Sequence, residues 1–211
     1  MKQWTLGVLL LAAGPAAAGG CQAFSVSATD GYANVRMTPG VTAQNSVAAL
    51  PSGTSITVVR TDGDGWLQIE SPVQGWIART QTASRPCESA AGVSATKGLA
   101  AIARLAKEAI AGDRGSAATF LRMSRGLDGS FADAYGEAIT HWAARNPTSL
   151  VARLEREPPA VRAAALESLA FGWGTGSRKE RRQFEAALAR RPPARPLARE
   201  WRRLAQDAPS P

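Results

Sequence analysis

The stretch LPSGTSITVVRTDGDGWLQIE, residues 50–70, is the most informative part of the chain for its fold. Residues 55–60 are rich in Val, Ile and Thr, which favour strands, and Pro51-Ser52-Gly53 precedes them as a turn. Asp62-Gly63-Asp64-Gly65 is typical of a tight hairpin turn, and Leu67 and Ile69 alternate with polar residues after it. The stretch therefore predicts two consecutive antiparallel strands.

Further short strands are predicted on either side of this hairpin. Residues 34–36 and 46–50 precede it, separated by a long polar loop, and residues 75–78 follow it. Five short strands with turn residues between them are typical of a small β-barrel. We expect this barrel to cover residues 24–84.

The same residues carry a resemblance to a known family. Their motifs, in chain order, are Asn34-Val35-Arg36 followed by Pro39, Leu50-Pro51-Ser52-Gly53-Thr54 followed by Val58, Gly65-Trp66 followed by Ile69, and Gly75-Trp76-Ile77. This order and spacing resembles the bacterial SH3 (SH3b) family, over less than a third of the chain. At Met37-Thr38 the sequence departs from the Ser-Gly usual in that family, which leaves the choice of ligand open.

The resemblance implies binding rather than catalysis, with a cell-wall peptide or a protein segment as the ligand. Aromatic and arginine side chains contribute most of the energy in many binding sites. The candidate groove residues are Tyr32, Asn34, Arg36, Trp66 and Trp76. Other interpretations stay open, because the tryptophans could belong to the core and Arg36 could lie on a solvated face.

From Ser94 onward, Ala, Leu, Arg and Glu dominate, and apolar residues recur at helical spacing. Residues 85–93 are the expected linker, and residues 94–208 the expected helical domain. Asn146 before Pro147 is a helix-start signal, and the glycines at 172, 174 and 176 are expected to end a helix in a turn. The predicted fold is a two-part α+β chain: a small SH3-like β-barrel, followed by an all-α helical bundle or short α-solenoid.

The first residues have the pattern of an export signal. Lys2 precedes a short apolar run, and Ala16-Ala17-Ala18 match the small residues of a cleavage site. We expect residues 1–18 to be a cleaved signal peptide and the protein to be periplasmic or secreted. Cys21 lies just beyond, so a lipoprotein anchored through Cys21 is the alternative, although Ala18 fits that signal poorly.

The chain has two cysteines, Cys21 and Cys87, and they flank the predicted barrel. An exported chain meets an oxidising compartment, and the ends of a small barrel can lie close together. We therefore predict a Cys21–Cys87 disulfide. It would close a loop of roughly 66 residues, which the chain-entropy model values at about 4 kcal/mol.

The net charge of +8 is concentrated near the C-terminus, where residues 178–211 hold ten basic and four acidic residues. The basic block comprises Arg178, Lys179, Arg181, Arg182, Arg190, Arg191, Arg195, Arg199, Arg202 and Arg203. Such a block fits an anionic membrane or an acidic polymer, or simply a solvated face of the last two helices. Because we expect export, nucleic acid is not an expected partner.

Catalytic signals are weak. His141 is the only histidine, and it forms a row with Asp133 and Glu137 that fits either polar surface or the edge of a site. Asp62 and Asp64 fit a turn better than a calcium loop, so we name no catalytic residue, metal ligand or cofactor. We expect a non-catalytic envelope protein that binds peptidoglycan peptide or an envelope protein. The alternative is a cell-wall-acting enzyme, or a regulator of one, targeted by the SH3b domain.

Overall fold

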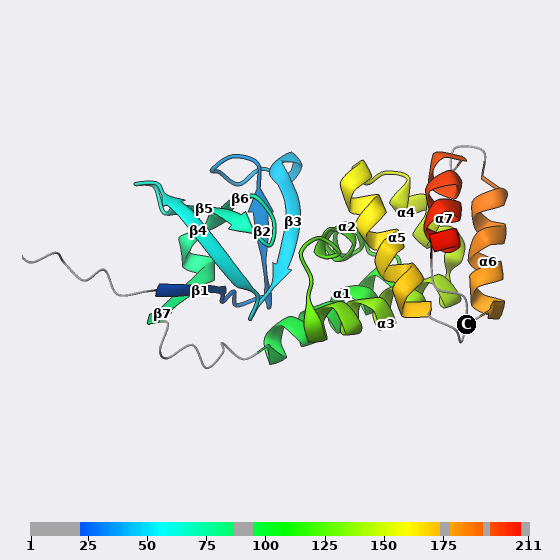
Figure 1. The fold of residues 1–211 in the computed structure, drawn as a ribbon, viewed down its shortest axis with the longest axis horizontal. Helices are drawn as coiled ribbons and strands as arrows, with labels where there is room; N and C mark the ends of the chain where they lie inside the picture. The colour runs from blue at the N-terminus through cyan, green and yellow to red at the C-terminus, as the bar shows by residue number, and fades with distance from the viewer. Residues whose placement is uncertain (1–21, 87–94, 174–177, 192–194, 208–211) are drawn as a thin grey trace, which may run out of the picture.

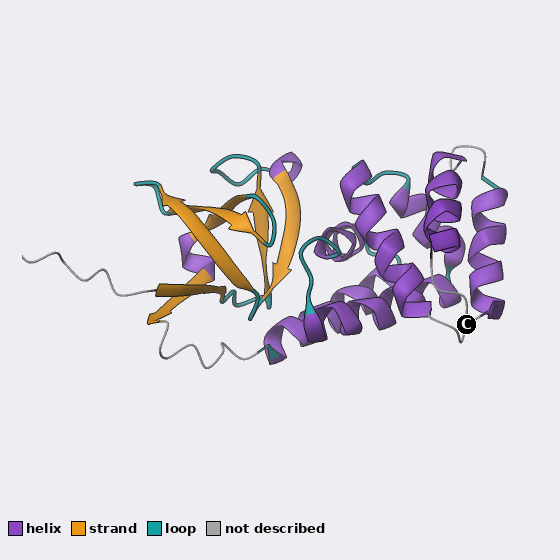
Figure 2. Cartoon of the chain, viewed as in Figure 1, coloured by secondary structure: helices purple, strands orange, loops and turns teal. Residues whose placement is uncertain are grey.

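A computed structural model describes residues 22–86, 95–173, 178–191 and 195–207 of the chain. Strands occupy the N-terminal part and helices the C-terminal part, so the predicted two-part order of β structure and then α structure is confirmed (Figures 1 and 2). We call residues 22–86 the sheet part and residues 95–207 the helical part. The predicted signal peptide and both cysteines lie outside the described residues.

The sheet part is one antiparallel seven-stranded sheet in the order β3-β2-β6-β5-β4-β1-β7, with β3 and β7 as its edges. This hydrogen-bonded order is that of an open sheet rather than a closed ring. The strands are β1 (Gln22–Val26), β2 (Tyr32–Arg36), β3 (Ser46–Pro51), β4 (Ser55–Thr61), β5 (Trp66–Ser71), β6 (Gly75–Ala78) and β7 (Thr82–Pro86).

All five predicted strands are present, and the sequence analysis missed β1 and β7. These two strands pair with each other over their full length, from Gln22 opposite Pro86 to Val26 opposite Thr82. β7 has no alternation of large apolar residues, and β1 has only Phe24 and Val26, so the signal on which a strand prediction depends is absent or short. Their existence follows from their pairing with each other and from the pairing of β1 with β4.

One side of every central strand faces the core of the sheet part. Val35, Ile69 and Ile77 are fully buried there, and Leu67 is 1% exposed. These residues alternate with more exposed neighbours, because successive side chains of a strand point to opposite faces. The alternation fixes which residues lie on the outer face.

The described helical part holds seven α-helices. They are α1 (Thr96–Ile110), α2 (Arg114–Met123), α3 (Gly129–Arg145), α4 (Pro147–Leu154), α5 (Pro159–Trp173), α6 (Arg178–Ala189) and α7 (Arg195–Asp207). The predicted start of α4 is confirmed, since the Asn146 side chain accepts a hydrogen bond from the Ser149 amide and Pro147 opens the helix.

Gly172 corrects one expectation, because it lies inside α5 rather than in a turn. A Cβ atom at Gly172 would lie 2.5 Å from the carbonyl oxygen of Gly136 and 2.9 Å from Thr140 Cγ2, both on α3. Glycine is therefore required for the close crossing of α3 and α5. The expected turn at residues 174 and 176 falls outside the described residues.

The helical part has its own core, with aromatic residues at two places. Phe120 stacks on Tyr135 with ring centroids 4.6 Å apart. Near the C-terminus, Trp173, Phe184 and Trp201 make edge contacts with one another at centroid distances of 5.3–5.6 Å. These contacts tie α6 and α7 to the end of α5.

The two parts share an interface in which glycines bring the backbones together. A Cβ atom at Gly31 would lie 2.6 Å from the Lys97 carbonyl oxygen, and one at Gly98 would meet the Ser52 carbonyl oxygen and Phe131 Cε1. Ala49 of β3 belongs to the hydrophobic core of the helical part. Helix α2 lies against edge strand β3, and the Arg125 side chain donates to the Val47 carbonyl at 3.2 Å (Figure 1). The helical part therefore covers this edge of the sheet.

Candidate binding face

Four of the five candidate groove residues lie on the outer face of the sheet part. On β2, Ala33 and Val35 are fully buried, whereas Asn34 and Arg36 point to the other side and are partly exposed. The alternation along a strand separates the two sets. Arg36 and Asn34 are thus available on a solvent-accessible surface rather than in the core.

The two candidate tryptophans lie on the same outer face. On β6, Trp76 is partly exposed between buried Gly75 and Ile77. On β5, Trp66 and Gln68 are partly exposed and alternate with buried Leu67. Neither tryptophan is a member of the hydrophobic cluster that forms the core of the sheet part.

Strand register brings these residues together. Arg36 is opposite Trp76 across β2 and β6, and Gln68 is opposite Trp76 across β5 and β6. Trp66 is opposite Ala78, which makes it a diagonal neighbour of Trp76 on the same face. We call Asn34, Arg36, Trp66, Gln68 and Trp76 the tryptophan face. The sequence analysis missed Gln68, which only strand pairing could reveal.

Gly75 allows β6 to approach β2 closely enough for this arrangement. A Cβ atom at Gly75 would lie 2.6 Å from Val35 Cγ1 and 2.7 Å from the carbonyl oxygen of Arg36. Any larger residue would push the strands apart. The glycine that precedes Trp76 in the sequence therefore has a direct structural role beside the tryptophan face.

The loop from Met37 to Asn45 lies next to the face and is held by one buried side chain. Asn45 Oδ1 accepts a hydrogen bond from the Thr38 amide at 3.1 Å, and Asn45 Nδ2 donates to the Thr38 carbonyl at 2.8 Å. Arg36 Nη1 donates to the Thr42 carbonyl at 2.8 Å, which ties the loop to the face. The same loop exposes Met37 at 62% and Val41 at 79%.

On the other side, the β4–β5 hairpin turn positions Trp66. Asp62 Oδ1 accepts hydrogen bonds from the Trp66 amide at 2.8 Å and from the Asp64 amide at 3.2 Å. This is the local bonding that makes aspartate common in turns. In the part of the chain that the structure describes, no three His, Cys, Asp or Glu residues are grouped to hold a metal ion.

Tyr32 lies on the same side of β2 as Asn34 and Arg36, but the helical part covers it. It begins β2, and its partly buried side chain packs against the hydrophobic core of the helical part. The structure therefore brings together Asn34, Arg36, Trp66 and Trp76 and sets Tyr32 at the interface between the two parts. The sequence gives no signal for this, because the contact depends on residues more than sixty positions away.

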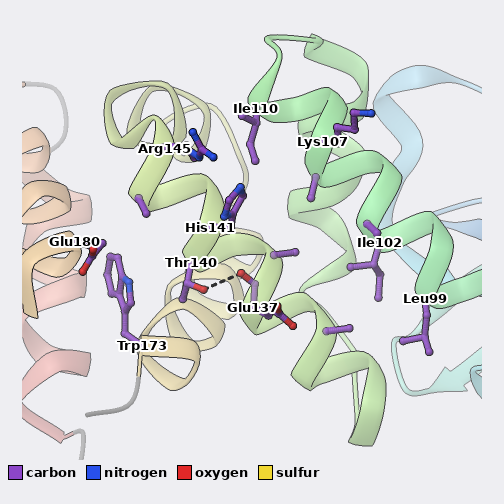
Figure 3. Close-up of a pocket in the computed structure, with 15 residues that line it drawn as sticks. Leu99, Ile102, Lys107, Ile110, Glu137, Thr140, His141, Arg145, Trp173 and Glu180 are labelled. Atoms are coloured by element: carbon purple, nitrogen blue, oxygen red, sulfur yellow. Dashed lines mark hydrogen bonds between the residues drawn. The ribbon is translucent and has the colours of Figure 1, made fainter. Parts of the chain in front are cut away.

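The helical part has an open groove between α1 and α3 with a volume of about 820 Å³ (Figure 3). Leu99, Ile102 and Ile110 of α1 line one wall, and Glu137 and His141 of α3 line the other. Asp133, Glu137 and His141 are all exposed. The row is therefore surface, and two of its members border the groove.

The basic block divides into paired and unpaired side chains. Arg181 bonds Glu185 at 3.1 Å, and Arg191 bonds Glu155 at 2.9 Å. The side chain of Arg195 lies outside the described residues. The remaining seven are exposed: Arg178, Lys179, Arg182, Arg190, Arg199, Arg202 and Arg203.

The described helical part buries one carboxyl group, that of Glu157. Burial raises the pKa of Glu157, and the guanidinium of Arg122, 3.3 Å away, opposes that rise only in part. Burial likewise raises the pKa of Tyr135 far above its ordinary value. Both groups lie away from the tryptophan face.

Comparisons of the chain with family models, with curated proteins and with solved structures found no match. Among the described residues, no helix combines the length and apolar character needed to cross a membrane.

Proposed function

We propose that the protein is an exported, non-catalytic cell-envelope protein whose sheet part is an SH3b-like barrel that binds an extended peptide. The ligand is a cell-wall peptide or a segment of an envelope protein. The helical part, in this proposal a bundle, is an interaction domain attached to the barrel. The motif resemblance of residues 24–84 supports the family, and the tryptophan face supports the binding role.

The observation that carries the proposal is the position of Trp66 and Trp76 outside the core. Two large aromatic side chains are partly exposed on one face, and neither belongs to the hydrophobic core of the sheet part. Tryptophan and arginine are the residues most enriched at the energetic centres of interfaces. An exposed face that combines both types favours ligand binding over a purely structural role.

The surroundings of the face fit a peptide better than a small compact ligand. Tryptophan rings offer flat apolar surface, while Asn34, Arg36 and Gln68 carry donors and acceptors suited to a peptide backbone or a carboxylate. Asn34 Oδ1 also accepts a hydrogen bond from Ser46 Oγ, and Arg36 Nη1 donates to the Thr42 carbonyl, so both side chains are held in place on the face. The loop that Asn45 holds is ordered before the ligand arrives, so binding costs little loop-ordering entropy. The same loop exposes two further apolar side chains, Met37 and Val41.

The Cys21–Cys87 disulfide belongs to the same proposal. Gln22 and Pro86, the residues next to the two cysteines, are direct partners at the ends of β1 and β7. This pairing supports a covalent link that closes the sheet part in an oxidising envelope.

The test is cosedimentation of the full chain with purified sacculi from which attached anionic polymers have been removed. We expect the protein to pellet above the level of a control protein, and soluble wall peptides to release it. Stripping the polymers prevents the C-terminal cations from contributing to retention. If the protein stays in the supernatant, wall binding is wrong and a protein segment becomes the expected ligand of the tryptophan face.

A further inference from the structure

The outer faces of α6 and α7 carry basic side chains that the protein does not neutralise. Arg178, Lys179 and Arg182 are exposed on α6, and Arg190 follows directly, its amide bonded to the Ala186 carbonyl at 3.1 Å. None of these four forms an ion pair with another described residue. Every charged residue of α6 that is described as exposed is basic.

Helix α7 repeats this pattern. Leu197 and Trp201 are 2% exposed and face the core of the helical part. Arg199, Arg202 and Arg203 lie on the opposite side and are exposed, and within the described residues none of them has a carboxylate partner. We call the seven exposed residues of α6, its C-terminal end and α7 the basic face.

The two helices form one unit. Phe184 of α6 and Trp201 of α7 are in edge contact, and Trp201 Nε1 donates to Glu185 Oε1 at 3.1 Å. Glu185 also bonds Arg181, whose guanidinium lies 5.6 Å from the Trp201 ring centroid. This cluster holds α6 against α7 at the end of the molecule far from the sheet part (Figure 1). Arg181 thus has a structural role, unlike the residues of the basic face.

We propose that the basic face binds a linear, phosphate-rich polyanion. Six of its seven cations are arginines, whose planar guanidinium groups match phosphate oxygens with two parallel hydrogen bonds. Each contact releases counterions from a polyanion, so affinity rises with the number of phosphates that are neutralised.

The same surface does not fit insertion into a membrane. Peripheral helices anchor in lipid through exposed large apolar side chains. Phe184, Leu188, Leu197 and Trp201 are all buried, so the described residues of α6 and α7 expose no such anchor. The observations therefore favour a polymer over a lipid surface.

The experiment measures binding of the full chain to inorganic polyphosphate across a salt series, with vesicles of anionic phosphatidylglycerol as the second probe. Seven contacts predict a slope of log affinity against log salt of roughly −5. The triple variant Arg199→Gln, Arg202→Gln and Arg203→Gln should reduce that slope by about 2 and weaken binding at least tenfold. The control Arg79→Gln, Lys107→Gln and Arg114→Gln removes the same charge from exposed positions elsewhere and should bind like wild type.

Three results would overturn the proposal: no binding of polyphosphate, equal losses in the two triple variants, or binding to vesicles without binding to polyphosphate. The last result would identify the basic face as a membrane-docking surface. Circular dichroism of both variants checks that the helices are intact.

Discussion

Arg36 and Trp76, forty positions apart in the sequence, are directly opposite each other on the neighbouring antiparallel strands β2 and β6. The pairing sets the two residues side by side on the outer face of the sheet part, where Arg36 Nη1 donates to the Thr42 carbonyl of the neighbouring loop. It depends on Gly75, whose missing side chain lets β6 lie against the backbone of Arg36. The tryptophan face is therefore a product of the fold, assembled from three strands that the sequence separates.

The loop beside the face gives the first prediction. Asn45→Ala removes the hydrogen bonds that this buried side chain makes with Thr38, so the loop loses its fixed conformation. We expect the free energy of unfolding to fall by about 1–3 kcal/mol and the affinity for the ligand to fall with it. Denaturant titration and the sacculus assay measure the two effects. The neighbouring exposed variant Gln44→Ala should change neither, and equal behaviour of the two variants would contradict this role.

The interface between the two parts gives the second prediction. Alanine normally stabilises a helix relative to glycine by up to about 1 kcal/mol. At Gly98 of α1 we expect the opposite, a loss of about 1–3 kcal/mol, because the new methyl group would meet Ser52 and Phe131. Gly115→Ala in α2 is the matched control, since nothing lies closer than 3.5 Å to its Cβ position. Thermal unfolding of both variants tests the close packing, and a stabilising Gly98→Ala would show that the two parts do not meet there.

Glu157 gives a prediction for pH. Because its pKa is raised in the folded protein, the folded state binds this proton more readily than the unfolded state does. The stability that protonated Glu157 provides is fully present below the pKa of this group in the unfolded chain. It is lost as pH rises through the raised pKa of the folded protein. We expect the stability of Glu157→Gln relative to wild type to increase as pH rises above about 4, the usual pKa of an unfolded glutamate. Urea unfolding of the variant and the wild type at several pH values measures this difference in the free energy of unfolding. If the variant gains no stability relative to wild type as pH rises, the attraction of Arg122 offsets or exceeds the effect of burial.

The cysteines give a covalent prediction. Gln22 and Pro86, which adjoin the two cysteines in the sequence, are direct partners at the ends of β1 and β7. We expect protein purified from an oxidising compartment to show no free thiol by alkylation and intact-mass measurement. Cys87→Ser should lower the free energy of unfolding by about 4 kcal/mol. A lipid-modified Cys21 in the intact mass would contradict the disulfide.

Local signals in the sequence predicted much of the fold. The alternation of Leu67 and Ile69 after a glycine-rich turn predicted β5, and Asn146 with Pro147 predicted the start of α4. These features act between residues a few positions apart, so they can be recognised without tertiary structure. β7 lacks such a signal and β1 has only Phe24 and Val26, so both strands depend on pairing with distant strands.

The site was predictable in its residue types but not in its geometry. Tryptophan after glycine, and arginine in the first motif, marked Trp66, Trp76 and Arg36 as candidates. Only strand register could show that they share a face, and only contact with the helical part could show that Tyr32 is covered there. Gly172 was likewise predicted to lie in a turn. The contact that requires a glycine there is made with Gly136 on another helix, which the local sequence does not reveal.

The most direct test of the tryptophan face as the binding site is the affinity of the full-length Trp76→Ala variant for polymer-stripped sacculi. A cosedimentation isotherm measures this affinity. Phe171→Ala is the control, because Phe171 is an aromatic residue of the helical part that is 70% exposed. We expect Trp76→Ala to weaken binding at least tenfold, as the loss of a central aromatic contact does in other interfaces, and Phe171→Ala to bind like wild type. A folded Trp76→Ala protein that binds sacculi as tightly as wild type would contradict the assignment of the tryptophan face as the binding site.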